Sequence, residues 1–385
     1  MKVLAPGATI GILGGGQLGR MLVLAAQAMG YRTAVLDPDV HAPAGAAANR
    51  QVCAPLHDLD AVAELARQVQ CITFEFENIP LDIAHAAARH GAVYPHPDIL
   101  SIAQHRVREK SFLADRGYPV TPFRAVHTAA AARQAFGQLG GAAILKTAMA
   151  GYDGKGQVAV SAVEAIAPAW ELLATPEAVL EKRVDLAGEF SLIVARRADG
   201  QTAVHGPFGN YHRNHILSAT VWPAALPEAM GLQAQAIAHA LARDLELVGL
   251  LCIEFFVTHA GALLINELAP RPHNSGHLTI EAHETSQFAQ HIRALCGLPL
   301  GATTARRPAA AMANLLGELW SEGEPDWTHA LADAGVSLHL YDKHKPAHGR
   351  KMGHLTVLDT HPARALRRVL RARQRLTGAR CDSVR

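Results

Sequence analysis

The sequence predicts a chain built of α/β and α+β units, and three observations lead to this fold class. The first hundred residues alternate short apolar runs with helical patterns, which is the signature of a parallel α/β sheet. The central part has runs of neighbouring strands followed by helices, which is typical of an α+β domain. With 385 residues, 49% of them hydrophobic and 18% charged, the chain is long enough for two or three domains with cores of their own.

The N-terminal unit, residues 1–100, has strands predicted at 8–13, 33–37 and 71–76, and helices from residue 17 and over 60–68. A helix predicted over 97–116 follows it and ends before Gly117 and Pro119. The central unit, residues 101–300, has helices predicted at 129–139 and 228–245, and strands at 143–148, 179–184, 190–196, 250–257 and 262–268. The last unit, residues 301–385, has strands predicted at 311–315, 337–341 and 353–358, and then a terminal helix.

The net charge of +2 conceals a basic tail. Residues 363–385 contain eight arginines and a single acidic residue, Asp382, so the rest of the chain is acidic. An acidic body does not favour a nucleic-acid-binding protein, and no nucleic acid is expected as a partner. Leucines and valine recur at near-helical spacing among the arginines, which predicts an amphipathic helix with a solvated basic face. Binding of a polyanion by that face is the alternative.

Neither a membrane nor an oxidising compartment is expected. No apolar run reaches the roughly 18 residues that a membrane-spanning helix needs, and the N-terminal apolar run is broken by glycines and Gln17. The five cysteines form no C-x-x-C pair, so disulfides and structural zinc are not expected. These features predict a cytoplasmic protein without a membrane partner.

A glycine-rich turn follows the first predicted strand. Residues 14–19, Gly-Gly-Gly-Gln-Leu-Gly, fit G-x-G-x-x-G, and Asp37 ends the second strand at the distance expected of a ribose-binding acid. Alone, this fingerprint predicts a dinucleotide such as NAD and an oxidoreductase. Because N–H groups at a helix start can face any anion, another phosphate-bearing ligand fits as well.

A second glycine-rich segment follows Lys146, which ends an apolar strand. Residues 151–157, Gly-Tyr-Asp-Gly-Lys-Gly-Gln, place three glycines and a lysine within a short stretch. Such a loop can expose backbone N–H groups and fold over a triphosphate, although an ordinary hairpin turn is the alternative. The segment lacks the G-K-[ST] of a P-loop, so a different nucleotide-binding fold is required.

Two glutamates, Glu254 and Glu267, lie in apolar strands on either side of a turn at 259–261. A hairpin would bring the carboxylates together, and paired carboxylates in apolar surroundings need a cation. Oxygen ligands of this kind, together with Asn266, suit Mg²⁺ bridging phosphate oxygens. A salt bridge between one glutamate and Arg271 is the alternative.

Two polar segments complete the candidate site. Residues 271–277, Arg-Pro-His-Asn-Ser-Gly-His, have no hydrophobic period and are expected to contact a ligand, although either histidine taken singly could be incidental. Lys343, Arg350 and Lys351 concentrate three cations that suit a phosphate monoester. Solvated surface charge is the alternative for these three.

Taken in order, these segments resemble the ATP-grasp family and, within it, the 5-(carboxyamino)imidazole ribonucleotide synthetases. The resemblance covers residues 10–358 and rests on G-I-L-G-G-G-Q-L-G-R-M, F-E-F-E-N-I-P, K-T-A-M-A-G-Y-D-G-K-G-Q, N-E-L-A-P-R-P-H-N-S-G-H, and Y-D-K with G-R-K-M-G-H. The sequence departs from it at His105, where relatives often have aspartate, and at Asn214-His215, where they often have glycine.

The resemblance implies an ATP-grasp fold with a Rossmann-like N-terminal domain and a small C-terminal domain, assembled as a homodimer. It implies a ligase that uses ATP and bicarbonate to carboxylate the exocyclic amine of 5-aminoimidazole ribonucleotide in purine biosynthesis, through carboxyphosphate. The implied cofactors are ATP and two Mg²⁺ ions, without NAD or biotin. Formate-using or glycine-using purine ligases of the same class are the nearest alternatives. A non-catalytic nucleotide sensor is disfavoured because both Glu254 and Glu267 are retained.

The resemblance also assigns roles to individual residues. Catalytic roles fall to Lys146, Lys155, Arg271 and Asn274. ATP-binding roles fall to Arg106, Lys146, Gly151, Tyr152, Asp153, Gly154, Lys155, Gly156, Gln157, the hinge residues Glu181, Lys182, Arg183 and Val184, and Glu189, His212, Asn266 and Glu267. Substrate-binding roles fall to Gln17, Glu75, Tyr152, Asp153, Arg271, His273, Asn274, Ser275, Lys343, Arg350 and Lys351. The metal ligands are Glu254 and Glu267.

Overall fold

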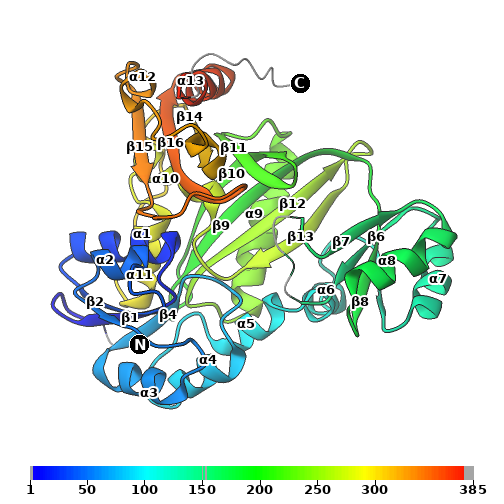
Figure 1. Ribbon diagram of the computed structural model, residues 1–385, viewed down its shortest axis with the longest axis horizontal. Coiled ribbons are helices and arrows are strands. Elements are labelled where there is room, and N and C mark those ends of the chain that lie inside the picture. Colours follow the sequence, from blue (N-terminus) through cyan, green and yellow to red (C-terminus); the bar gives the residue numbers. More distant parts are fainter. Residues whose placement is uncertain (1–2, 150, 152–153, 377–385) are drawn as a thin grey trace.

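The chain folds around three β-sheets in this computed structural model, which describes residues 3–149, 151 and 154–376 (Figure 1). The first sheet has four parallel strands in the order β3-β2-β1-β4. Its strands are β1 (Thr9–Leu13), β2 (Arg32–Leu36), β3 (Arg50–Val52) and β4 (Cys71–Phe74). Its helices are α1 (Gln17–Ala28), α2 (Pro43–Ala47), α3 (Leu59–Gln68) and α4 (Leu81–Ala88). The predicted parallel α/β alternation is confirmed.

This parallel pairing positions the first part of the site. Because β1 pairs with β4 in the same direction, the segments that follow the two strands meet at one edge of the sheet. The glycine turn after β1 therefore lies beside Glu75, which follows β4.

The prediction of one helix over 97–116 is wrong, because two helices occupy these residues, α5 (Pro97–Ala103) and α6 (Arg106–Asp115). The chain leaves helical geometry at His105, whose Nδ1 accepts the backbone N–H of Arg108 at 3.4 Å. A side-chain acceptor at this position satisfies an N–H that a helix start leaves unpaired. The imidazole of His105 thus serves as the N-cap of α6.

A small antiparallel sheet, order β5-β8-β6-β7, follows α6. Its strands are β5 (Phe123–Val126), β6 (Ala143–Thr147), β7 (Gln157–Val160) and β8 (Ala178–Lys182). Helices α7 (Ala129–Gln138) and α8 (Ile166–Leu173), with the 3-10 turn η1 (Val163–Ala165), close its apolar core. β6 and β7 form a hairpin whose connection is the second glycine-rich segment.

The third sheet has eight antiparallel strands in the order β13-β12-β9-β10-β11-β14-β16-β15. The first five in chain order are β9 (Leu186–Arg196), β10 (Thr202–Arg213), β11 (Ile216–Trp222), β12 (Gly249–Thr258) and β13 (Leu263–Ala269). The C-terminal strands β14 (Ala309–Leu316), β15 (Val336–Leu340) and β16 (Lys351–Asp359) continue the same sheet. Neither β10 nor β11 was predicted from the sequence.

Helices and short turns cover the eight-stranded sheet. They are α9 (Glu228–Asp244), η2 (Asn274–Gly276), α10 (Thr279–Ala282), α11 (Gln287–Leu295), η3 (Gly317–Trp320), α12 (Trp327–Ala330) and α13 (Pro362–Arg375). The predicted terminal amphipathic helix is confirmed as α13, which packs Ala365, Val369 and Ala372 against the sheet. In the part of the chain that the structure describes, none of the helices has the length and hydropathy that crossing a bilayer requires.

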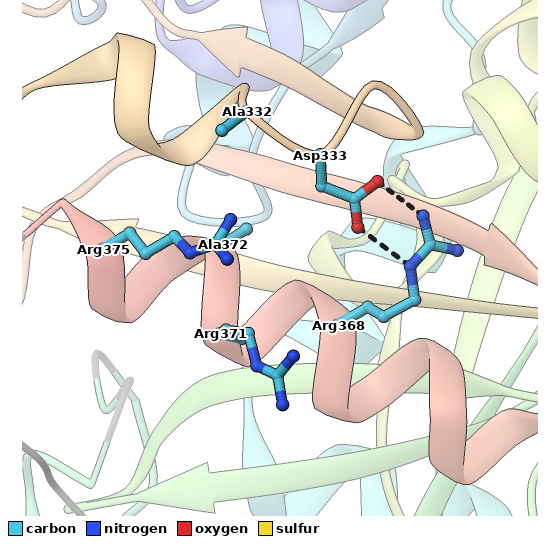
Figure 2. Close-up of a pocket in the computed structure, with 6 residues that line it drawn as sticks. All are labelled: Ala332, Asp333, Arg368, Arg371, Ala372 and Arg375. Atoms are coloured by element: carbon cyan, nitrogen blue, oxygen red, sulfur yellow. Dashed lines mark hydrogen bonds and ion pairs between the residues drawn. The ribbon is translucent and has the colours of Figure 1, made fainter.

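Beside α13 lies a hollow of about 190 Å³, which Figure 2 shows with its lining residues. The lining residues are Ala332, Asp333, Arg368, Arg371, Ala372 and Arg375. Arg368 donates to both oxygens of Asp333, at 2.7 and 2.9 Å, and to Asp359 at 2.9 Å. The basic face is therefore partly neutralised by the fold, and none of the predicted ligand-binding residues lines the hollow.

Candidate active site

The glycine turn at the start of α1 bonds to carboxylates of its own chain. Asp37 accepts the N–H of Gly15 at 2.7 Å, and Glu75 accepts those of Gly16 and Gly19 at 2.6 and 2.8 Å. Burial raises the pKa of Glu75, although the two N–H donors oppose the rise. Because these amides already hold anions, the geometry argues against a dinucleotide pyrophosphate here.

Substrate-binding residues predicted in the N-terminal and C-terminal units lie close together at this turn. Lys343 Nζ donates to Gln17 Oε1 at 2.5 Å and to the carbonyl oxygen of Lys351 at 2.8 Å. Burial and the neighbouring Arg350 lower the pKa of Lys343 to about 8, although Glu75 opposes the shift. The three cations predicted at the C-terminal end therefore lie near one another, and Lys343 reaches the N-terminal unit.

Arg106, at the start of α6, holds the second glycine-rich segment. Its guanidinium donates to the carbonyl oxygen of Thr147 at 2.8 Å and to that of Gly151 at 2.9 Å. The N–H of Thr147 donates to Gly156 O at 2.9 Å, which closes the base of the loop. Lys155 lies exposed on the loop. Tyr152 and Asp153, predicted for ATP and substrate, lie outside the described residues.

The turn between β10 and β11 packs against this loop. A Cβ atom added to Gly154 would lie 2.5 Å from Cβ of His215, so the close approach requires glycine at position 154. Asn214 and His215 have φ angles of 50° and 65°, which is left-handed backbone. Asparagine and histidine tolerate this conformation better than most residues. Asn214 and His215 therefore hold a turn conformation that glycine adopts easily.

Glu181, predicted for the adenine hinge, turns its side chain toward two lysines. Its Oε2 accepts from Lys146 Nζ at 3.0 Å, and its Oε1 lies 3.3 Å from Lys110 Nζ. Burial alone would raise the pKa of Glu181, but the two ammonium groups outweigh it and lower the pKa. Lys110 was missed in the sequence, where its only signal is its position one helical turn after Arg106.

The backbone amides of the next two predicted hinge residues are used in hydrogen bonds to neighbouring segments of the small-sheet unit. Lys182 donates its backbone N–H to Pro122 O at 2.8 Å, and Arg183 donates its own to Ala142 O at 2.9 Å. Lys182 and Arg183 are exposed, and Val184 is half-buried. The segment therefore presents side chains and carbonyl groups, rather than these two amides, to a ligand.

The two predicted metal ligands lie opposite each other. β12 and β13 form the expected hairpin, and Glu254 pairs directly with Glu267 in its register. His273 Nε2 lies 2.9 Å from Glu254 Oε1 and lowers the pKa of that carboxyl against the effect of burial. Glu267 makes no hydrogen bond or ion pair within the described ranges. Although part of the residue is exposed, desolvation by the surrounding site and the charge of Glu254 raise its pKa.

These features fit a divalent cation. Carboxylates directly opposite on one face of a hairpin repel each other, and Glu267 reaches solvent without a cationic partner among the described residues. Hard oxygen ligands of this kind suit Mg²⁺. Asn266, the third predicted oxygen ligand, lies next to Glu267 on β13 and also accepts from Lys110 through its carbonyl at 3.4 Å.

Arg271 forms a bidentate pair with Glu77, which follows β4 in the N-terminal unit. Nη2 donates to Oε1 at 2.8 Å, and Nε donates to Oε2. Burial would raise the pKa of Glu77, but Arg271 holds it at about 2. The alternative that Arg271 neutralises a metal-site glutamate is therefore wrong. Glu77 was missed, although it lies in the same F-E-F-E-N-I-P motif as Glu75.

Glu189 and His212, predicted for ATP, pair with each other across neighbouring strands β9 and β10. Their Oε2 and Nδ1 atoms lie 3.0 Å apart. Burial would lower the pKa of His212, but Glu189 reverses the effect and raises it. The pair borders the Glu254 side of the site, because Glu254 also raises the pKa of His212.

Asn274 and Ser275 lie behind His273 rather than on the surface. The side-chain amides of Asn274 and Asn314 bond to each other at 2.6 and 3.1 Å. Ser275 is 0% exposed and bonds to Ser191 and to His273 Nδ1, at 2.7 and 2.8 Å. Ser275 therefore braces His273, whereas Asn274, which is 6% exposed, is held by Asn314.

Three family profiles match successive parts of the chain. The ribonucleotide synthetase preATP-grasp domain matches residues 7–104, and the ATP-grasp domain matches residues 111–288. The phosphoribosylaminoimidazole carboxylase C-terminal domain matches residues 310–368. Together with the lysine, carboxylate and loop geometry, these matches define an ATP-grasp ligase.

The chain is similar along its length to one group of these ligases. The N5-carboxyaminoimidazole ribonucleotide synthase of Bacillus subtilis (strain 168) is 42% identical over 357 residues, 93% of each chain. That of Brucella melitensis biotype 1 is 43% identical over 355 residues, 92% of this chain and 97% of the relative. The chain belongs to the N5-carboxyaminoimidazole ribonucleotide synthase family. The family, fold class and enzyme class predicted from the sequence are confirmed.

Solved structures agree with this assignment. The ADP complex of an N5-carboxyaminoimidazole ribonucleotide synthetase matches with a TM-score of 0.91 and 41% identity, over 97% of this chain and 98% of the other. An Aspergillus clavatus synthase in complex with ADP and 5-aminoimidazole ribonucleotide matches with a TM-score of 0.87 and 28% identity, over 96% and 99%.

Proposed function

We propose that the chain uses ATP and bicarbonate to carboxylate the exocyclic amine of 5-aminoimidazole ribonucleotide, giving the N5-carboxy product, ADP and phosphate. The observation that carries the proposal is the Glu254–Glu267 pair, placed opposite each other in a chain that also brings Lys146 and the glycine-rich segment to the site. The relatives solved with ADP, and with ADP and the ribonucleotide, support both ligands as substrates.

The first step is a phosphoryl transfer. A bicarbonate oxygen attacks the γ-phosphorus of ATP, the bond to the β–γ bridging oxygen breaks, and ADP leaves carboxyphosphate behind. Such a reaction depends on positioning and on cations around the moving charge, which Lys146 and Arg106 supply. Mg²⁺ held by Glu254 and Glu267 would offset charge on the phosphate oxygens.

The second step forms the carbon–nitrogen bond. The amine attacks the carboxyl carbon of carboxyphosphate, or of CO₂ released from it, and loses a proton while phosphate leaves. Carboxyphosphate is unstable in water, so the 151–157 segment with Lys155 has a reason to cover it. Arg271 and His273 lie on the Glu254 side of the site, where they can orient the reacting groups.

The ribonucleotide is placed between the N-terminal and C-terminal parts of the chain. Lys343 donates to Gln17 there, Glu75 accepts the backbone N–H of the neighbouring Gly16, and Arg350 lies near Lys343. A lysine and an arginine suit the 5′-phosphate, and Gln17 and Glu75 suit sugar or base hydroxyl and amine groups. The homodimer, the second Mg²⁺ ion and the cytoplasmic location remain predictions.

The substrates can be tested by ADP release. We expect ADP to form only when 5-aminoimidazole ribonucleotide and bicarbonate are both present with Mg-ATP, and we expect formate not to replace bicarbonate. The reason is that only bicarbonate supplies an oxygen nucleophile that leaves a carboxyl group for the amine. Turnover with formate, or ADP release that is indifferent to the ribonucleotide, would remove the proposed function.

The lowered pKa of Lys343 predicts a pH dependence. Below pH 8 the ammonium is charged and can bind phosphate, and above pH 8 it loses the charge. We expect kcat/KM for the ribonucleotide to fall about fivefold between about pH 7 and 9, with ATP and bicarbonate saturating. Lys343→Arg should flatten the profile, because guanidinium stays charged. A wild-type profile as flat as that of the variant contradicts the assignment of Lys343 to the phosphate.

A further inference from the structure

Helix α6 lies between the small sheet and the eight-stranded sheet and contacts both. Lys110, on this helix, has a side chain that is 1% exposed. Its Nζ lies 3.3 Å from Glu181 Oε1 on β8 and 3.4 Å from the carbonyl oxygen of Asn266 on β13. A fully buried lysine is rare unless it is paired, so its position has a specific cause.

The two oxygens of Glu181 are shared between two lysines. Lys146 is 11% exposed and binds Oε2, whereas Lys110 is buried and binds Oε1. Two cations against one anion leave an excess positive charge, and only Lys146 reaches solvent. Without Lys110, the carboxylate of Glu181 would be balanced by Lys146 alone, and the charge that Lys146 offers to a phosphate would fall.

Neighbouring residues of α6 show that the helix fixes the distance between the two sheets. Glu109 is buried and accepts the backbone N–H of Leu268, next to Glu267, at 2.9 Å. Arg106 donates to the carbonyl oxygens of Thr147, at the end of β6, and of Gly151 in the loop. Residues at i, i+3 and i+4 share one helix face. The face of α6 that carries Arg106, Glu109 and Lys110 therefore joins β6, which carries Lys146, to β13, which carries Glu267.

We propose that Lys110 is a positioning residue for ATP. It holds Glu181 by one oxygen, so that the other oxygen orients Lys146 without cancelling its charge, and it sets the separation of β8 and β13. Lys110 itself is too buried to touch the nucleotide. This inference rests on the proposed function, because it concerns the ATP of that reaction.

Replacing Lys110 by methionine tests the proposal. We expect Lys110→Met to raise the KM for Mg-ATP at least about fivefold, with the KM for the ribonucleotide changed less than about twofold. In a double-mutant cycle, Lys110→Met/Glu181→Gln should raise the KM for ATP less than the two single variants combined, because once Glu181 is neutral the loss of Lys110 no longer leaves a buried carboxylate to cancel Lys146. Arg371→Met, which removes an exposed cation on α13 (Figure 2), is the control for loss of a positive charge outside the site.

If Lys110→Met does not fold, the double variant is compared with the single variant Glu181→Gln instead. Glu181→Gln leaves two ammonium groups side by side, so adding Lys110→Met should lower the KM for ATP at least about threefold. An ATP KM that is unchanged in Lys110→Met, or a double variant no better than either single variant, overturns the proposal. If the wild type does not release ADP with the ribonucleotide and bicarbonate, the proposed function is overturned. The role of Lys110 is then still tested by measuring the equilibrium binding of Mg-ATP to the same variants.

Discussion

Replacing Glu267 by glutamine is expected to abolish measurable turnover, a loss of at least about a hundredfold. The pairing of β12 with β13 places this carboxylate opposite Glu254, and both are assigned to Mg²⁺. A neutral amide is a poorer ligand and leaves the triphosphate charge less screened at the moment of transfer. Turnover is measured as ADP release with all substrates saturating, over a range of Mg²⁺ concentrations.

The same variant should keep its fold. Among the described residues, Glu267 has no hydrogen bond or ion pair to lose, and its charge is opposed by Glu254. We therefore expect the Tm to stay the same or to rise slightly, since a like-charge pair is removed. Glu164→Gln, at an exposed position of the turn η1, is the control for a charge change alone. Near-normal turnover in Glu267→Gln would show that Glu267 is not a metal ligand.

The metal-site hairpin could be predicted because its information is local. A largely apolar strand of ten residues, a short turn and a second apolar strand determine that β12 and β13 pair with each other. The register set by the turn pairs Phe255 with Ile265, and a shift between Glu254 and Phe255 then moves it by one residue, so that Glu254 lies opposite Glu267 rather than Asn266. The pairing of the strands was predictable, whereas this shift was not. The parallel N-terminal sheet was predictable for a similar reason, since each strand and helix carries its own periodic pattern.

Contacts between distant segments could not be predicted in the same way. Lys110 and Glu181 lie 71 positions apart in the numbering, and the burial of this lysine arises only when α6 is enclosed by two sheets. Arg271 and Glu77 are separated by 194 residues, and the helix break at His105 depends on a capping contact that the pattern does not reveal. Strands β10 and β11 were missed because polar residues and Gly206-Pro207 interrupt their alternation.

The glycine turn at residues 14–19 shows that one sequence pattern is compatible with more than one ligand. The spacing of Gly14, Gly16 and Gly19 fits a dinucleotide site, and so does the position of Asp37. In the folded chain, the carboxylates of Asp37 and Glu75 accept hydrogen bonds from the backbone amides of this turn. The spacing of the residues in the sequence cannot show these bonds. The pattern predicted the turn correctly and left the ligand open, because the same backbone geometry suits any anion.

Arg350→Ala is expected to raise the KM for the ribonucleotide at least about tenfold, a loss of roughly 1.4 kcal/mol. Arg350 is exposed, donates to the carbonyl oxygen of Lys345 at 2.6 Å, and lies close enough to Lys343 to lower its pKa. Its guanidinium can bind two oxygens of a phosphate monoester. Because the 5′-phosphate takes no part in the reaction, its binding stabilises ground state and transition state about equally, so kcat should change less than KM.

The control for this variant is Arg367→Ala, an exposed arginine on α13, which should leave both Michaelis constants within about twofold of the wild type. A sharper comparison uses the dephosphorylated riboside as substrate. If Arg350 binds the phosphate, the variant should lose kcat/KM for the ribonucleotide but hardly any for the riboside, because the riboside lacks the group that Arg350 contacts. An equal loss for both substrates, or a parallel rise in the KM for ATP, would mean that Arg350 supports the fold of the C-terminal part and that the substrate phosphate binds elsewhere.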